Sequence, residues 1–217
     1  MHIDLVLSAV FGYLFGSLPT AYIIARFMKG IDIRTVGSGT VGGSNVAVQV
    51  GVLPSIATLL FDLAKGALAI AIVRHYGGSD AAQMTAGIAS IVGHDWPVWL
   101  RFVGGRGIAT AGCVLFMFGP LEMIAVATLL EIGALVFRQG PVATLLVFAG
   151  WPLLAAWTGR PAEIIAGGII IWLIIVVRRL QGSPGVKRAV PGENVYWNRF
   201  WLDRDIKDEA KWVGQRD

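Results

Sequence analysis

The stretch PSIATLLFDLAKGALAIAIV, residues 54–73, decides the fold class of this chain. Its charged residues are Asp62 and Lys65, and its length matches the roughly 20 residues that a helix needs to cross a bilayer. A segment surrounded by lipid must satisfy its own backbone hydrogen bonds, which a helix does and an open strand edge does not. The stretch therefore predicts a membrane-spanning helix.

Other apolar stretches follow the same pattern along most of the chain. They cover residues 5–27, 81–99, 107–119, 121–137, 141–157 and 162–177. Gly119-Pro120 would break or kink a helix, so five or six full spans with a broken helix fit as well as seven. We predict an all-α, polytopic transmembrane bundle of about seven helices over residues 1–177, followed by a basic cytoplasmic tail over 178–217.

The composition agrees with a membrane protein. Of 217 residues, 55% are hydrophobic and 15% are charged, and the mean hydropathy is +0.67. A soluble domain has about 25% charged residues, so an ordinary soluble enzyme is excluded. The single cysteine, Cys113, excludes an internal disulfide. Lys and Arg number 18 against 14 Asp and Glu, but their placement beside apolar spans indicates membrane lipids rather than nucleic acid as the partner.

Positive charge predicts the orientation. With the amino terminus outside and seven crossings, only Arg74 and Arg160 fall outside, and Lys65 lies in or near a span. The other 15 basic residues face the cytoplasm, which is the side that Lys and Arg favour. They are Arg26, Lys29, Arg34, Arg101, Arg106, Arg138 and the nine from Arg178 to Arg216. The aromatic tail residues Tyr196, Trp197, Phe200, Trp201 and Trp212 fit equally an anionic lipid surface and a cap over the bundle.

A polar loop, DIRTVGSGTVGGSNVAVQVG from Asp32 to Gly51, interrupts the apolar pattern. Glycine lets neighbouring backbone N–H groups converge, and serine and threonine add hydroxyl donors. This is how a neutral loop holds an oxyanion such as phosphate. A flexible connector is the alternative, but connectors seldom hold so many glycines and hydroxyls, so we favour phosphate binding.

A second polar segment, GHDWPVWLRFVGGRGIATAG, runs from Gly93 to Gly112. Main-chain donors of Gly104, Gly105 and Gly107 could wrap an anion, with Arg106 adding a fixed charge. Gly107 would open the next helix, whose N-terminus favours phosphate. His94 fits a structural hydrogen-bonding role and a functional role equally well.

Asp62 and Lys65 lie three residues apart on one face of a predicted span. Charges in lipid are costly and normally pair, so we predict an ion pair that stabilises the bundle.

These segments resemble a known family. GSLPTAYIIA (16–25), IRTVGSGTVGGSN (33–45), FDLAKGALA (61–69) and GHDWPVWLRFVGGRGIAT (93–110) have the order and spacing of the bacterial acyl-phosphate-dependent glycerol-3-phosphate acyltransferases of the inner membrane. The resemblance covers residues 10–120 well. It implies a seven-helix enzyme that moves a fatty acyl group from acyl phosphate to the 1-hydroxyl of glycerol 3-phosphate, giving lysophosphatidic acid. It implies no metal and no direct use of coenzyme A or acyl carrier protein.

The resemblance also suggests site roles. Ser38 and His94 would be catalytic, with the proton taken by His94 or by a donor phosphate oxygen. One set would hold the acyl phosphate: Gly37, Ser38, Gly39, Thr40, Gly42, Ser44 and Asn45. A second set would hold the acceptor phosphate: Gly104, Gly105, Arg106 and Gly107.

The chain departs from the family motifs at three places. Val48 stands where the first motif, GSGNxGATNxxR, has an arginine, and Thr40 stands for its asparagine. Arg106 replaces the lysine of GGKG. The histidine and asparagine of the third motif are absent near Val177–Gly182. Either phosphate recognition has changed, or basic tail residues reach in as substitutes: Arg178, Arg179, Lys187 or Arg188.

Two other functions stay open at this point. A diverged member could use another acyl acceptor, or act without catalysis as a membrane scaffold or regulator. A small-anion transporter ranks third, because few polar residues lie at mid-bilayer depth, namely Asp62, Lys65 and Glu131.

Overall fold

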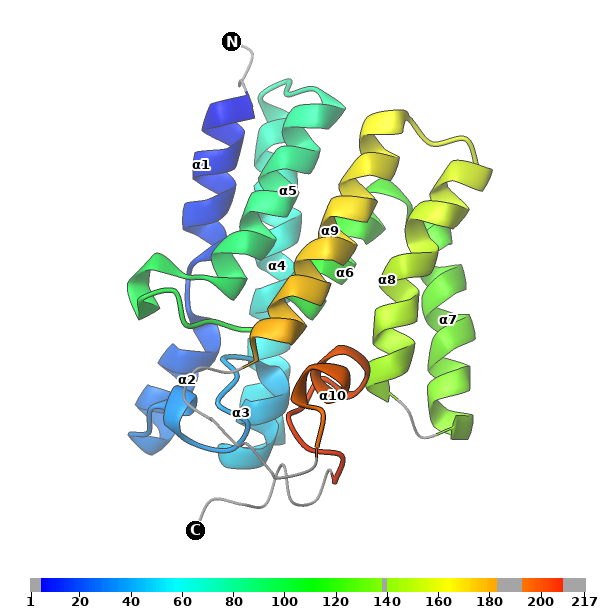
Figure 1. Ribbon diagram of the computed structural model, residues 1–217. Coiled ribbons are helices and arrows are strands. Elements are labelled where there is room, and N and C mark those ends of the chain that lie inside the picture. The colour runs from blue at the N-terminus through cyan, green and yellow to red at the C-terminus, as the bar shows by residue number, and fades with distance from the viewer. Residues whose placement is uncertain (1–4, 138–139, 183–192, 209–217) are drawn as a thin grey trace.

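The computed structural model describes residues 5–137, 140–182 and 193–208 (Figure 1). Within these ranges the chain forms helices and connecting loops, without a strand. The helices are α1 (Leu5–Gly16), α2 (Thr20–Lys29), α3 (Gly43–Gln49), α4 (Val52–His75), α5 (Asp80–Asp95), α6 (Ile108–Phe118), α7 (Pro120–Phe137), α8 (Gly140–Trp157), α9 (Ala162–Gln181) and α10 (Val195–Leu202), with short 3₁₀ turns at Ile33–Thr35 and Val98–Leu100.

Each predicted apolar stretch after the first coincides with one helix, from α4 to α9. The first stretch, 5–27, is not one helix, because the chain breaks between α1 and α2 at Ser17–Pro19. Proline disfavours helical backbone in the residue before it, here Leu18, and so ends α1. Among the described residues, three segments are long and apolar enough to cross a membrane, Leu5–Lys29, Val52–His75 and Gly140–Trp157. The total of about seven spans stays a prediction.

The predicted break at Gly119-Pro120 is confirmed. Helix α6 ends at Phe118 and α7 begins at Pro120, a position where proline's missing N–H costs nothing. Glu122 in the first turn of α7 is buried and accepts from Arg160 Nε at 2.7 Å. This ion pair ties the α6–α7 corner to the α8–α9 connection.

Helices α1 and α5 approach closely because glycine lines their contact. A Cβ on Gly12 would collide with the backbone carbonyl of Ala86, and one on Gly16 with that of Ser90. From the other helix, a Cβ on Gly93 would collide with the carbonyl of Tyr13. Small residues at such positions let helix backbones approach within a membrane.

Two apolar clusters hold the elements that carry the polar loops. The larger one joins α5, α6, α8 and α9 around the fully buried Trp151. The smaller lies beneath the first polar loop and includes Ala25, Ile33, Val46 and Leu100. It anchors the loop to α2 and to the 3₁₀ turn after α5.

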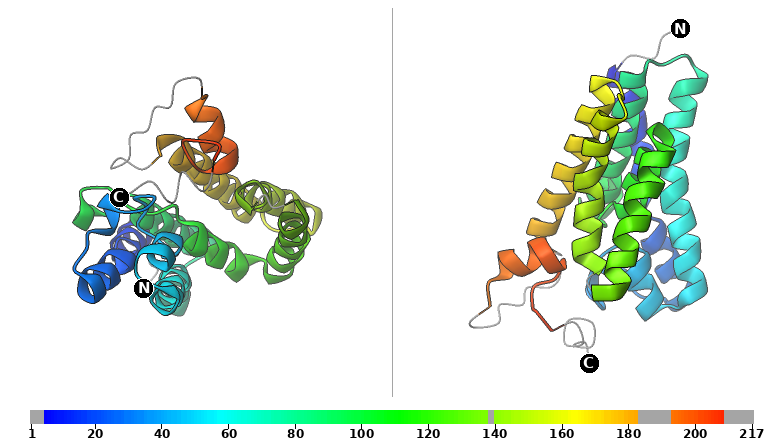
Figure 2. Two further views of the ribbon diagram at one scale, coloured as in Figure 1. Left: turned by 90° about the horizontal axis from the view of Figure 1, so that it is seen from below. Right: turned by 90° about the vertical axis from the view of Figure 1, so that its right-hand side faces the viewer.

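The tail folds back onto the bundle. Helix α10 lies across the ends of α8 and α9, at the same end of the molecule as α2 and α3, and the described chain begins at the opposite end (Figures 1 and 2). Asn194 caps α10 by accepting from Trp197 N at 3.1 Å. Helix α9 continues to Gln181, past the boundary at 177–178, and the division into membrane domain and tail stays a prediction.

Candidate active site

Asn45 organises the first polar loop. Its side chain is 4% exposed, and Nδ2 lies 3.0–3.1 Å from the carbonyl oxygens of Ile33, Val36 and Thr40. Its Oδ1 accepts from Ser38 N at 3.2 Å. The amide therefore shapes the loop, and Asn45 also borders the first cavity described below, so its predicted contact with phosphate stays a prediction.

Two glycines of the first polar loop have backbone conformations that other residues rarely adopt. Gly37 and Gly39 have φ values of 55° and 71°, in the left-handed region that favours glycine. Of these two, Gly37 borders a cavity described below, whereas Gly39 N donates to Val36 O at 3.1 Å within the turn.

Arg34 links the first loop to the second. Its guanidinium binds the Asp32 carboxylate, with Nη2 to Oδ2 at 2.6 Å, and Nη1 donates to Leu100 O at 3.3 Å. The Arg34 hydrogen bond holds the pKa of the Asp32 carboxyl below its ordinary value. The pair thus fixes the spacing between the loops.

The backbone of Gly104 and Gly105 is engaged within the protein. Arg178 donates from Nε to Gly105 O at 2.8 Å and from Nη2 to Gly104 O at 3.0 Å. Gly105 N donates to His94 O at 3.1 Å. Neither glycine lines either of the two cavities described below, and the prediction that their main-chain N–H groups wrap an anion stays a prediction. A Cβ at either would collide with His94, so close packing explains these glycines.

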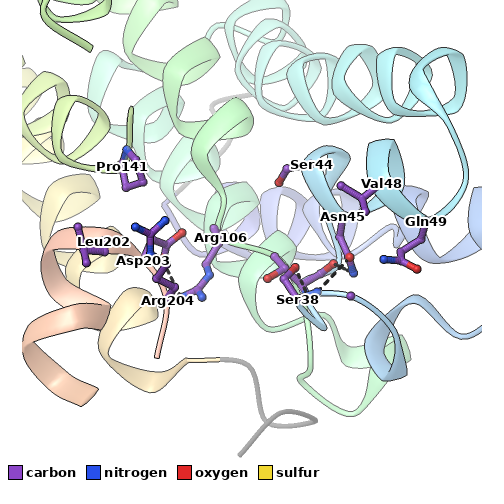
Figure 3. Close-up of a pocket in the computed structure, with 12 residues that line it drawn as sticks. Ser38, Ser44, Asn45, Val48, Gln49, Arg106, Pro141, Leu202, Asp203 and Arg204 are labelled. Atoms are coloured by element: carbon purple, nitrogen blue, oxygen red, sulfur yellow. Dashed lines mark hydrogen bonds and ion pairs between the residues drawn. The ribbon is translucent and has the colours of Figure 1, made fainter. Parts of the chain in front are cut away.

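The first cavity has a volume of about 320 Å³ and opens between the first loop and the tail (Figure 3). Arg106 lies between the loop that carries Ser38 and the turn that carries Asp203 and Arg204. The lining residues are Gly37, Ser38, Thr40, Ser44, Asn45, Val48, Gln49, Arg106, Pro141, Leu202, Asp203 and Arg204.

The second cavity, of about 290 Å³, adjoins the first and reaches toward the apolar helices. Thr40, Ser44, Arg106 and Asp203 line both cavities. The other lining residues of the second cavity are Gly42, Gly43, Leu59, Asp62, His94, Gly107, Ile108 and Ala109. Both polar loops therefore contribute residues to both cavities, and the assignment of one loop to each phosphate stays a prediction.

A buried polar cluster borders the second cavity. Lys65 Nζ donates to Asp62 Oδ1 at 2.9 Å, which confirms the predicted ion pair. Two further groups that were not predicted join this pair. Thr20 Oγ1 donates to the same carboxylate oxygen at 2.8 Å, and His94 Nδ1 lies 3.5 Å from it. The isolated polarity of Asp62 in an apolar span was the available signal.

Arg106 has an acidic partner that was not predicted from the sequence. Arg106 Nη1 lies 3.0 Å from Asp203 Oδ1, joining the second loop to the turn after α10. Asp203 has a φ of 54°, a left-handed conformation that helps to end α10. The charged run Asp203-Arg204-Asp205 marked this turn as unusual, without indicating where it lies.

Comparison with known proteins identifies the family. The family model described as "Glycerol-3-phosphate acyltransferase" matches residues 6–183. The chain belongs to the glycerol-3-phosphate acyltransferase family. Glycerol-3-phosphate acyltransferase 5 of Dehalococcoides mccartyi is 36% identical, over 99% of this chain and 95% of the relative. A glycerol-3-phosphate acyltransferase of Parasynechococcus marenigrum is 35% identical, over 83% of this chain and 84% of the relative.

The similarity extends to the folds of solved structures. The crystal structure of PlsY (YgiH), an integral membrane glycerol 3-phosphate acyltransferase, in its glycerol 3-phosphate form is 27% identical with a TM-score of 0.77. The alignment covers 98% of this chain and 99% of the PlsY chain. The lysophosphatidic acid form of PlsY gives a TM-score of 0.72 at 28% identity, covering 82% and 88%. The chain is thus an all-helical integral membrane protein of this family.

Of the predicted substitutes for the missing arginine, the two that the structure describes, Arg178 and Arg179, do not line the first cavity. Arg178 binds the backbone of the second loop, as described above. Arg179 donates to Phe200 O at 3.1 Å and to Pro141 O at 2.9 Å, holding α10 against α8. Lys187 and Arg188 lie outside the described residues. The tail instead brings Arg204 to the cavity.

Proposed function

We propose that this chain is a membrane acyltransferase that moves a fatty acyl group from acyl phosphate to the 1-hydroxyl of glycerol 3-phosphate. One observation carries the proposal: two cavities meet at Arg106, between hydroxyl-rich and basic loops, at one end of an apolar helix bundle. Acyl transfer between two phosphorylated substrates requires two phosphate sites next to each other. The printed name of the family and of its relatives supports the acceptor.

The lining of each cavity suggests which substrate it takes. The second cavity includes Leu59, Ile108 and Ala109, an apolar path suited to a fatty acyl chain. The first cavity is bounded by the first loop and the charged turn after α10, which suits a small polar acceptor. We assign the acyl phosphate to the second cavity and glycerol 3-phosphate to the first, with Arg106 between the two phosphates.

The chemistry is nucleophilic acyl substitution. The 1-hydroxyl oxygen attacks the acyl carbonyl carbon, the bond from that carbon to the phosphate oxygen breaks, and inorganic phosphate leaves. Because the donor is already activated, the protein has to align the two groups and neutralise charge. Ser38, Thr40 and Ser44 supply hydroxyl donors, and Arg106 supplies positive charge.

His94 is placed to take the proton of the attacking hydroxyl. It borders the second cavity, and Asp62 lies on the Nδ1 side of its ring. A carboxylate in this position orients an imidazole, as in other acid–base pairs. The departing phosphate is the alternative acceptor for the proton.

We further propose that the protein lies in the inner membrane with both polar loops on the cytoplasmic side. The first loop, Arg106 and α10 gather at one end of the bundle. Arg74, in the last turn of α4, and Arg160, in the α8–α9 connection, belong to the opposite end (Figure 1). The excess of basic residues at the site end supports a cytoplasmic assignment.

The test is an assay of purified protein in lipid nanodiscs with palmitoyl phosphate and glycerol 3-phosphate. We expect equimolar lysophosphatidic acid and inorganic phosphate. Palmitoyl coenzyme A as donor, or glycerol as acceptor, should give no comparable turnover. A protein that transfers the acyl group only to another acceptor would instead be a diverged member. One that gives no product with any donor or acceptor would contradict catalysis.

A further inference from the structure

The first cavity has a wall that comes from the tail. Leu202 ends α10, Asp203 and Arg204 follow it, and these residues face the first loop across Arg106 (Figure 3). These residues lie almost a hundred positions beyond Arg106 in the sequence. Their presence at the cavity depends on how the tail is held.

Contacts outside the cavity fix the tail turn. Arg199 binds the Asp205 carboxylate, with Nε to Oδ1 at 2.6 Å, and donates to Leu180 O at 3.0 Å. Asn198 Nδ2 lies 3.2 Å from Asp205 O, and the Asp205 and Ile206 side chains are 1% and 3% exposed. Buried, hydrogen-bonded residues thus hold both sides of Asp203-Arg204, so the turn is a built part of the site.

Charge in the first cavity depends on Arg204. Among its lining residues, Arg106 and Arg204 are cationic and Asp203 is anionic. Asp203 lies 3.0 Å from Arg106 and offsets its charge. Without Arg204 the lining would be neutral, whereas a phosphate monoester carries about 1.5 to 2 negative charges at pH 7. Val48 lines the first-loop side of the cavity, and its side chain has no hydrogen-bond donor.

We propose that Arg204 binds the phosphate of glycerol 3-phosphate and supplies the charge that the first loop lacks at Val48. A guanidinium matches the planar pair of oxygens that a phosphate presents, and it keeps its charge at all relevant pH values. Asp203 then holds Arg106 in place and turns α10 toward the cavity. The inference rests on the proposed function, since it assigns a residue to the acceptor site of that reaction.

The experiment compares steady-state kinetics of the wild type with Arg204→Ala, Arg204→Lys and the control Lys207→Ala, whose residue is exposed and borders neither cavity. For Arg204→Ala we expect KM for glycerol 3-phosphate to rise about tenfold to hundredfold, the loss of one charge-assisted contact. The KM for palmitoyl phosphate should change less than about twofold. Arg204→Lys keeps the positive charge but not the paired N–H donors of a guanidinium. Its KM for glycerol 3-phosphate should therefore lie between the values of the wild type and Arg204→Ala.

A second-site variant separates charge supply from structural support. Val48→Arg places a guanidinium in the same cavity, so in the Arg204→Ala background it should recover most of the lost affinity for glycerol 3-phosphate. Unfolding midpoints in detergent should match the wild type for all variants. If Arg204→Ala does not fold, the same comparison is made from Arg204→Lys, with and without Val48→Arg.

The outcomes distinguish the two proposals. A wild type that gives no lysophosphatidic acid overturns the proposed function. Active wild type with an unchanged KM for glycerol 3-phosphate in Arg204→Ala overturns only the role of Arg204. A rise confined to the KM for palmitoyl phosphate, or a loss that Val48→Arg does not recover, also overturns it.

Discussion

The carboxylate of Asp62, in the middle of α4, lies 3.5 Å from Nδ1 of His94 in the last turn of α5. The same carboxylate oxygen accepts from Lys65 and Thr20. An ion pair that stabilises the bundle therefore also contacts the candidate base. Asp62 therefore has a structural role in the ion pair and a positioning role beside His94. Measurements of stability and of turnover can separate these two roles.

His94→Gln should lower kcat by about 10²- to 10⁴-fold with little change in either KM, because general base catalysis contributes on that scale. The measurement is steady-state turnover with both substrates varied. His75→Gln is the matched control, since His75 ends α4 at the opposite end of the bundle and should behave as wild type. An unchanged kcat in His94→Gln would assign the proton to the departing phosphate.

Asp62→Asn should destabilise the fold by about 3–5 kcal/mol, because it leaves the buried ammonium of Lys65 without its counter-charge. The unfolding midpoint in detergent measures this effect. Adding Lys65→Met should recover part of the loss, since the double variant has no unpaired cation at this position. Equal stability of Asp62→Asn and wild type would show that the pair contributes little.

Ser38→Ala should lower kcat/KM by about tenfold to hundredfold, the value of a hydrogen bond to a charged phosphate of roughly 1.5–3 kcal/mol. Ser38 borders the first cavity, so the loss should appear in the glycerol 3-phosphate dependence. Thr144→Ala is the control, because that hydroxyl binds Gly140 O within α8. Full activity of Ser38→Ala would show that the Ser38 hydroxyl makes no hydrogen bond to the phosphate.

Orientation can be measured with single cysteines in a Cys113→Ser background. Thr35→Cys and Lys207→Cys replace exposed residues at the site end, and Tyr76→Cys replaces an exposed residue at the other end. In intact cells, a membrane-impermeant thiol reagent should label Tyr76→Cys and leave the other two unlabelled until lysis. The reverse pattern would place the site outside the cytoplasm.

Gly16→Leu should prevent the close approach of α1 and α5, because even a Cβ at this position collides with the backbone of Ser90. Overpacking of this kind costs about 1–3 kcal/mol or more, so the unfolding midpoint should fall sharply. Gly140→Ala is the control, as a Cβ there meets nothing within 4 Å. A Gly16→Leu protein as stable as this control would mean that the helices separate without cost.

Residues close together in the sequence determined the helices, one corner between helices and the donor groups of the candidate site. The apolar runs specify helices, because a backbone in lipid must bond to itself. Gly119-Pro120 specifies the corner between α6 and α7, and the spacing of Asp62 and Lys65 specifies an ion pair on one helical face. The first polar loop and Arg106 were recognisable from residue type alone, because glycine, hydroxyl groups and guanidinium are the chemistry that phosphate needs.

Contacts between distant residues were decided only by the tertiary structure. Helix packing brings His94 to Asp62, and Asn45 is turned into the loop by three carbonyl groups. Arg178 donates to the carbonyl oxygens of Gly104 and Gly105, a contact that residue type did not indicate. The tail reaches Arg106 because buried ion pairs and hydrogen bonds around α10 direct one turn into the cavity. Local pattern specifies helices and donor groups, but which donors meet depends on how the helices pack.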